Sequence, residues 1–120
     1  MTESNKAVLE SANAAIAAGD NEGLLALCSD DIVWTAVGES TLRGKQAVRE
    51  WMKTAYAEPP QFTVKRMVAE GDFVVALGDI VATDANGRTQ QNAYSDVWRF
   101  RDGKMAELKA FVVATGPGPG

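Results

Sequence analysis

The second half of the chain consists of residues that favour β-strands, and short turn sequences divide it at regular intervals. Strands are predicted over 61–69, 73–83, 92–101 and 105–114. The turns between them are Glu70-Gly71-Asp72, Asp84-Ala85-Asn86-Gly87 and Asp102-Gly103, and the second contains Asn-Gly, a strong hairpin signal. Consecutive strands joined by tight turns pair antiparallel, so this half predicts an antiparallel meander.

The first half predicts three helices and one strand. Apolar residues recur at helical spacing over 3–18, Gly19 ends this helix, and Asp20 is a good N-cap for a short second helix ending near Cys28. We expect a turn at 29–31, a strand over 32–37, a loop over 38–44 and a third helix through about Tyr56, which Pro59-Pro60 prevents from continuing. The order predicts an α+β fold, a single domain over 3–115, with helices covering a curved sheet that encloses a cavity, and a flexible tail over 116–120.

Composition excludes several function classes. The chain has 120 residues, a net charge of −4 and no apolar run long enough for a membrane span, so we expect neither nucleic-acid nor membrane partners. It contains no histidine, which excludes Ser-His and Cys-His nucleophile pairs and His-containing metal sites. No glycine-rich phosphate loop is present, and we expect neither metal nor cofactor. The single cysteine, Cys28, forms no internal disulfide and is best explained as a core residue. Together with the lack of a signal sequence, this favours the cytoplasm.

The strand predicted over 92–101 is the best candidate for a site. Alternate residues of a strand share a face, so one face carries Asn92, Tyr94, Asp96, Trp98 and Phe100. Two large aromatic side chains on this face favour burial, and a carboxyl, an amide and a phenol lie among them. This combination is typical of a binding or catalytic cavity. The other face carries Ala93, Ser95, Val97, Arg99 and Arg101.

Asp96 is the residue that we expect to carry any chemistry. In an apolar pocket its pKa rises, so that it donates a hydrogen bond when neutral and acts as a base when ionised. The alternatives are a strand that faces the other way, or a structural ion pair between Asp96 and Arg66 or Lys109. Tyr94 is a second catalytic candidate, although a tyrosine in a strand also serves for packing.

Four further residues are candidates for binding a ligand. Trp34 and Trp98 are expected to form cavity walls, and Asn92 is expected to orient a ligand. Asp79 is a reserve acid whose facing the β-rich run around it leaves ambiguous.

Several strings, in this order and spacing, are similar to the NTF2-like superfamily, and within it to ketosteroid-isomerase-like and SnoaL-like proteins. They are 14–20 with 24–27 and 30–31, Arg43-Gly44 with 47–51, Asp96-Val97-Trp98-Arg99-Phe100 with 103–105, and Lys109-Ala110-Phe111. The resemblance covers nearly the whole chain and implies a cone of three helices and a curved sheet. It also implies a homodimer formed through the outer face of the sheet. The same fold carries many chemistries, so it specifies activity less well.

Ketosteroid isomerase combines an Asp base with an oxyanion hole made of a Tyr and a protonated Asp. By resemblance, the protonated acid falls on Asp96, the tyrosine on Ala12 and the base on Thr35, which therefore enters only as an inherited site position. Two of the three groups are missing, so we expect that the protein is not a ketosteroid isomerase.

Two functions remain open from the sequence. One is cofactor-free isomerase, lyase or hydrolase chemistry on a small apolar or carbonyl-containing molecule. The other is a non-catalytic dimer that binds a ligand or serves as a scaffold. A third, protein recruitment, requires an exposed aromatic patch, for instance at Trp34 or Trp51, and is less favoured.

Overall fold

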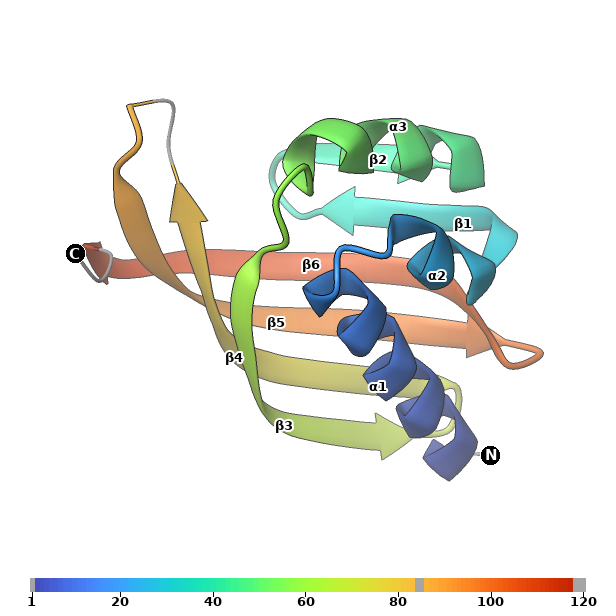
Figure 1. Ribbon diagram of the computed structural model, residues 1–120. Coiled ribbons are helices and arrows are strands. Elements are labelled where there is room, and N and C mark those ends of the chain that lie inside the picture. Colours follow the sequence, from blue (N-terminus) through green and yellow to red (C-terminus); the bar gives the residue numbers. More distant parts are fainter. Residues whose placement is uncertain (1, 84–85, 118–120) are drawn as a thin grey trace.

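The computed structural model describes residues 2–83 and 86–117 and contains three helices and six strands (Figure 1). The helices are α1 (Thr2–Ala17), α2 (Asn21–Ala26) and α3 (Lys45–Ala55). The strands are β1 (Cys28–Ala36), β2 (Ser40–Arg43), β3 (Gln61–Glu70), β4 (Phe73–Thr83), β5 (Thr89–Arg101) and β6 (Lys104–Pro117).

All six strands form one sheet in the order β2-β1-β6-β5-β4-β3. Every pair is antiparallel except β1 and β6, which run parallel. The three helices lie against one face of this curved sheet (Figure 1), which we call the inner face, and the opposite side is the outer face. The predicted α+β architecture is thereby confirmed, including the antiparallel meander of the second half.

The segment between α2 and α3 differs from the prediction in two places. Strand β1 begins at Cys28, so residues 29–31, predicted as a turn, are extended. The predicted loop 38–44 contains the edge strand β2, whose Thr41 and Leu42 pair with Thr35 and Trp34. This strand has only four residues and is largely exposed, so it lacks the apolar alternation that marks longer strands.

The predicted start of α2 is confirmed. The Asp20 carboxylate accepts a hydrogen bond of 2.9 Å from the Gly23 backbone N–H, which is the N-cap interaction.

A bulge in β3 changes which of its residues face the helices. The register between β3 and β4 shifts between Val64 and Arg66. Because a bulge adds one residue, alternation restarts after it, and Met67 joins Val64 on the inner face while Arg66 points outward. Strict alternation along the predicted strand 61–69 would place Arg66 on the same face as Val64, and the bulge is the reason that it does not.

At the C-terminus, β6 extends two residues beyond the predicted domain boundary. Gly116 and Pro117 pair with Gln91 and Gln90, although we predicted that they belong to a flexible tail. Residues 118–120 of that tail, and Asp84-Ala85 of the predicted turn, lie outside the described residues. Within the turn, Gly87 has a φ of 79°, a conformation that glycine adopts without strain.

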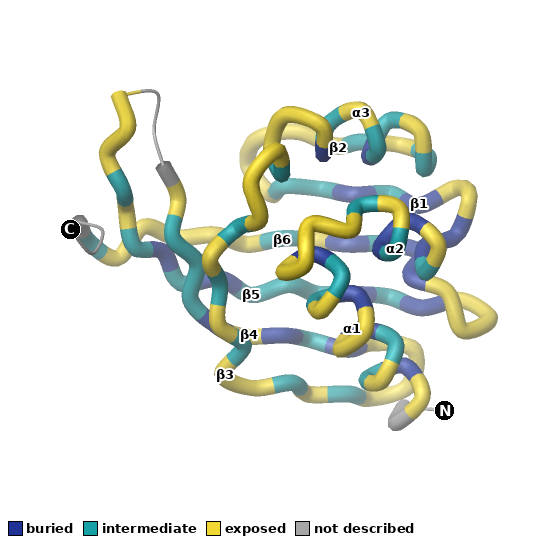
Figure 2. The backbone as a smooth tube through the Cα atoms, in the orientation of Figure 1, coloured by how far each residue is buried: buried dark blue, intermediate teal, exposed yellow. Residues whose placement is uncertain are grey.

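The core lies between the helices and the inner face of the sheet. Figure 2 shows that buried positions gather where helices cover the strands, whereas the β4–β5 hairpin end is mostly exposed. Fully buried side chains come from every layer, and the largest include Leu9, Leu24, Leu25, Ile32, Met52, Met105 and Leu108. Among the helices described, none has the length and apolarity to cross a membrane.

Candidate functional site

Asp96 lies on the inner face in a row of small residues. Along the ladders, Asp96 pairs with Ala76 of β4 on one side and with Ala110 of β6 on the other, and Ala110 pairs with Ala36 of β1. Directly paired residues share a face of the sheet, so Ala76 and Ala110 flank the carboxyl, and Ala36 continues the row beyond Ala110. We call this the alanine row.

No described residue makes a hydrogen bond or an ion pair with the Asp96 carboxyl. Burial raises its pKa to about 7, because removal from water disfavours the charged form. The two cations that we considered as partners lie on the other side of the sheet: Lys109 pairs with Val97, and Arg66 pairs with Leu77. The structural ion pair is therefore not formed, and the carboxyl faces the helices as expected.

A cluster of four aromatic residues lies next to the alanine row, on the same side of the sheet. The ring of Trp34 lies 5.5 Å from that of Trp98, edge to face, and 5.5 Å from that of Trp51. Trp51 in turn lies 5.1 Å from Tyr56 at the end of α3. We call Trp34, Trp51, Trp98 and Tyr56 the aromatic cluster. Trp34 is only 5% exposed, so it offers no surface patch of the kind that protein recruitment requires.

Tyr94 precedes Asp96 by two residues on the inner face and lies over Gly78. A Cβ added at Gly78 would be 2.9 Å from Tyr94 Cε2, so the glycine makes room for the ring. The pKa of Tyr94 is raised to about 12, first by burial and then by the charges of Asp96 and Asp79. The structure therefore places Tyr94 beside Asp96, as a neutral phenol at physiological pH.

Asn92 has a different environment. Its buried side-chain amide donates to the carbonyls of Gln90 and Ile80, at 3.2 and 3.4 Å. The bond to Ile80 ties β5 to β4, and the two bonds together engage the NH2 of the amide group that we expected to orient a ligand.

Thr35 and Asp79 are not brought to the site. Thr35 pairs with Lys109 on the outer face, and its hydroxyl lies 3.2 Å from that of Thr41. Asp79 pairs with Ala93, also on the outer face, and forms an ion pair of 2.9 Å with Lys65. The expectation that these two residues line the same cavity as Asp96 is corrected: alternation along β1 and β4 turns both away from it.

Tyr56 is a residue of the site that the sequence did not reveal. It caps the C-terminus of α3, and burial followed by the charge of Asp96 raises its pKa above its ordinary value. Tyr56 packs against the core beside Trp51, on the same side of the sheet as Asp96. The available signal was weak: Tyr56 follows Met52 by one helical turn, directly before the sequence that ends the helix.

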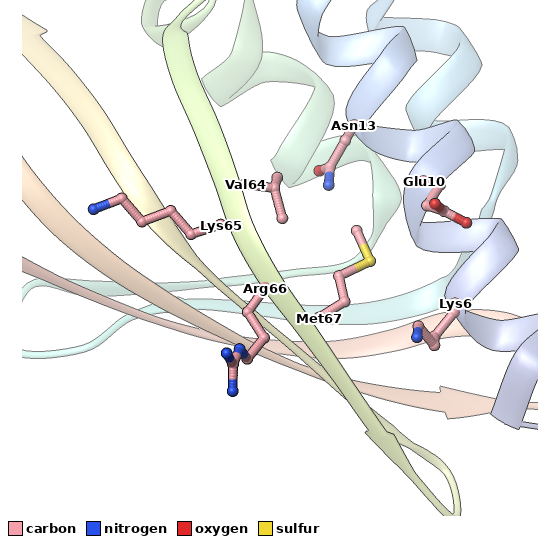
Figure 3. Close-up of a pocket in the computed structure, with 7 residues that line it drawn as sticks. All are labelled: Lys6, Glu10, Asn13, Val64, Lys65, Arg66 and Met67. Atoms are coloured by element: carbon pink, nitrogen blue, oxygen red, sulfur yellow. The ribbon is translucent and has the colours of Figure 1, made fainter.

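Two open hollows lie elsewhere on the molecule. The larger, about 420 Å³, lies between α1 and the bulge of β3 (Figure 3), where Lys6, Glu10 and Asn13 face residues 64–67. In Figure 3, Met67 points toward α1 whereas Lys65 and Arg66 point away from it. The second, about 360 Å³, is on the outer face beside Phe73 and Val97. Asp96 lines neither hollow.

Comparison with solved structures shows the fold. An NTF2-like protein from Burkholderia xenovorans LB400 is 25% identical, with a TM-score of 0.80 over 93% of this chain and 91% of that one. An NTF2-like protein of unknown function from Burkholderia pseudomallei K96243 is 24% identical, with a TM-score of 0.80 over 89% and 88% of the two chains. An LEH-like epoxide hydrolase of M. tuberculosis is 19% identical, with a TM-score of 0.81 over 92% and 84%.

None of the curated proteins compared with the chain matches it. At the level of family, residues 9–108 match the SnoaL-like domain, a stretch that begins in α1 and ends in β6 and includes Asp96, Tyr94, Tyr56 and the three tryptophans. The resemblance seen in the short strings is thus carried by most of the chain, and the protein belongs to the SnoaL-like domain family, within the NTF2-like fold.

Proposed function

We propose that the protein catalyses cofactor-free proton transfer on a small carbonyl compound, with Asp96 as the group that carries the proton. The observation that supports this most directly is the Asp96 carboxyl itself. It is desolvated on the helix-facing side of the sheet, and no described residue pairs with it. Its pKa of about 7 is suited to taking and returning a proton near neutral pH.

The chemistry follows from the ionised form. The Asp96 carboxylate removes a proton from the carbon next to the ligand carbonyl, and the C–H electron pair moves to form an enolate with its charge on oxygen. Returning the proton to the same or a conjugated carbon completes an exchange or an isomerisation. The Asp96 carboxylate is regenerated when its acid form gives the proton back, so no further reactant is needed.

This role differs from the one that resemblance to ketosteroid isomerase implies for Asp96. There the acid is a hydrogen-bond donor and a separate Asp is the base. Here the inherited base position is Thr35, which faces outward, and the inherited tyrosine position is Ala12, which is fully buried in the core. Both placements support a chemistry other than that of ketosteroid isomerase, in which Asp96 itself moves the proton.

The second candidate is binding without catalysis. In this case Asp96 stays neutral and donates a hydrogen bond to the ligand carbonyl. The aromatic cluster favours it as much as catalysis, because flat rings offer an apolar surface to any planar ligand.

We also propose that the outer face forms a homodimer. Its large apolar side chains are exposed in the single chain: Val68, Phe73, Leu77, Phe111 and Val113. Four charged groups of this face form two ion pairs, Lys65 with Asp79 and Arg99 with Glu107, while Arg66 and Lys109 also face outward. A face with several exposed apolar side chains and partly paired charges is suited to an isologous contact with a second copy.

Exchange of α-protons tests the proposed reaction. β-Tetralone, a planar bicyclic ketone with acidic α-protons, is incubated in D₂O, and loss of its proton NMR signal is followed with and without protein. The wild type is expected to accelerate exchange, with a rate that rises with pH and levels off above about 7.

The variant Asp96→Asn separates the two candidates. It keeps the shape and a donor but cannot take a proton from carbon. Loss of exchange with retained binding supports proton transfer by Asp96. If the wild type binds β-tetralone but gives no exchange above buffer, catalysis is contradicted and the binding function stands.

A further inference from the structure

We propose that the Tyr56 hydroxyl donates a hydrogen bond to the ligand oxygen while Asp96 handles the proton, so that α3 supplies the oxyanion donor of the site. This inference rests on the proposed function of Asp96. It assigns to a helix-end residue the task that resemblance would place at Ala12 of α1.

The course of α3 brings Tyr56 to the row of Asp96. The N-terminus of α3 is held beside β1, because the N–H of Gly44, the residue before the helix, donates to the Ile32 carbonyl at 2.7 Å. Figure 1 shows that α3 then runs over β1 and β2 in the direction of β1, toward the Ala36 end. Ala36 belongs to the row of Ala110 and Asp96, so the end of α3 lies over this row.

Neighbouring contacts fix the ring in this place. The Tyr56 N–H donates to the Met52 carbonyl at 2.9 Å, and the ring lies 5.1 Å from Trp51, which itself lies 5.5 Å from Trp34. Trp34 is one position before Thr35 and two before Ala36. Beyond it, Ala36 begins the row that continues through Ala110 to Asp96.

The hydroxyl is available for a ligand. None of the residues that the structure describes makes a hydrogen bond with Tyr56 Oη, and none makes one with the Asp96 carboxyl. The Tyr56 side chain is partly buried, and its hydroxyl is not one of the fully buried atoms that lack a partner, so a ligand oxygen would replace water there. The unpartnered phenol and carboxyl, both on the helix-facing side of the sheet, are the polar groups that such an oxygen would meet.

The phenol is also in the right protonation state. Burial and then the negative charge of Asp96 raise the pKa of Tyr56 above its ordinary value, so it remains a neutral donor at the neutral pH at which Asp96 begins to ionise. A neutral phenol next to the anionic base can donate a hydrogen bond to the enolate oxygen and stabilise its negative charge.

Tyr56→Phe tests the inference, with Thr41→Val as the matched control. Each variant removes a single hydroxyl, and that of Thr41 lies on the exposed edge strand β2, next to the outward-facing Thr35. Intrinsic tryptophan fluorescence reports that each variant is folded. In the β-tetralone exchange assay, Tyr56→Phe is expected to lower kcat about 100-fold with little change in KM, because the lost bond forms mainly to developing charge. Thr41→Val is expected to change kcat less than about threefold, and the pH at which the rate levels off stays the same in both variants.

A second readout does not depend on turnover. With ¹³C-labelled tyrosine, saturating β-tetralone is expected to shift the Tyr56 Cζ resonance, assigned by its loss in Tyr56→Phe. Exchange and binding that survive Tyr56→Phe unchanged, with no shift at Tyr56, overturn this inference and leave the role of Asp96 intact. Absence of both binding and exchange in the wild type overturns the proposed function and this inference together.

Discussion

Asp96 and Asp79 lie on neighbouring strands of the sheet but on opposite faces of it. Asp79 is on the outer face, where Lys65 pairs with it at 2.9 Å. Asp96 is on the inner face, where burial raises its pKa to about 7. The environment thus decides how each aspartate behaves: the Asp79 carboxylate is paired with a lysine at the surface, whereas burial holds the pKa of Asp96 well above that of an ordinary carboxyl.

Asp96 makes the stability of the fold depend on pH. Its pKa is about 7 in the folded protein and about 3.9 in an unfolded chain, so between these values the folded state binds the extra proton. Stability is therefore lost as pH rises through this window. Relative to Asp96→Asn, the wild type is expected to lose roughly 1–3 kcal/mol of unfolding free energy between pH 5 and pH 8.

Urea unfolding of both proteins at these two pH values measures this difference. Glu22, Asp31 and Glu50 have lowered pKa values through their partners Arg49, Arg101 and Lys53, so they titrate below the window and do not interfere. An unfolding free-energy difference between wild type and Asp96→Asn that is the same at both pH values would contradict a desolvated Asp96.

Gly78→Ala is expected to destabilise the protein. The added Cβ would be 1.9 Å from the Thr63 carbonyl oxygen and 2.9 Å from Tyr94 Cε2, and the first contact is with backbone that cannot move aside cheaply. We expect a loss of about 1–3 kcal/mol, typical of overpacking, in chemical denaturation. Gln90→Ala, an exposed position of the same hairpin, is the control, and equal stability of both variants would show that β3 is not packed this closely on β4.

Phe111→Lys is expected to dissociate the proposed homodimer. Phe111 is 42% exposed on the outer face, so the substitution is tolerated by a single chain but places a charge inside the contact. Sedimentation velocity should show a dimer for the wild type and a monomer for the variant. The neighbouring Val112 faces inward and is 52% exposed, so Val112→Lys should stay dimeric. A monomeric wild type, or a dimer that Phe111→Lys leaves intact, is the result that rules out this face.

Cys28 is expected to be unreactive in the folded protein. Burial raises the pKa of its thiol to about 11, and only a small fraction is thiolate at pH 8. Alkylation by iodoacetamide followed by mass spectrometry should be slow under native conditions and fast in urea. Rapid alkylation of the native protein would mean that the space between α2 and β1 is open to solvent.

Local patterns predicted most of the fold. The helices, the meander and the Asp20 cap each depend on residues close in sequence, such as the Asp-Gly turn before β6 or the prolines after α3. Strand β2 was missed because an edge strand of four residues carries no such pattern. The bulge at Lys65 was missed because an extra residue is visible only once β3 is paired with β4.

The site was predicted only in part, for a related reason. Asp96, Tyr94 and Trp98 share one strand, so alternation alone placed them together. Thr35 and Asp79 lie on other strands. Which side of the sheet each of them occupies depends on how β1 and β4 pair with their neighbours, and this pairing cannot be read from the sequence. Tyr56 reaches Asp96 only because α3 ends over the alanine row, which is a property of the packed structure.

The central claim is best tested by measuring the pKa of Asp96 directly. Carboxyl ¹³C resonances are followed through a pH titration by NMR, and the Asp96 signal is assigned by its absence in Asp96→Asn. We predict a midpoint of about 7, the value of a desolvated carboxyl that can take and return a proton at neutral pH. A midpoint near 4 would mean a solvated carboxylate and would contradict proton transfer at this site.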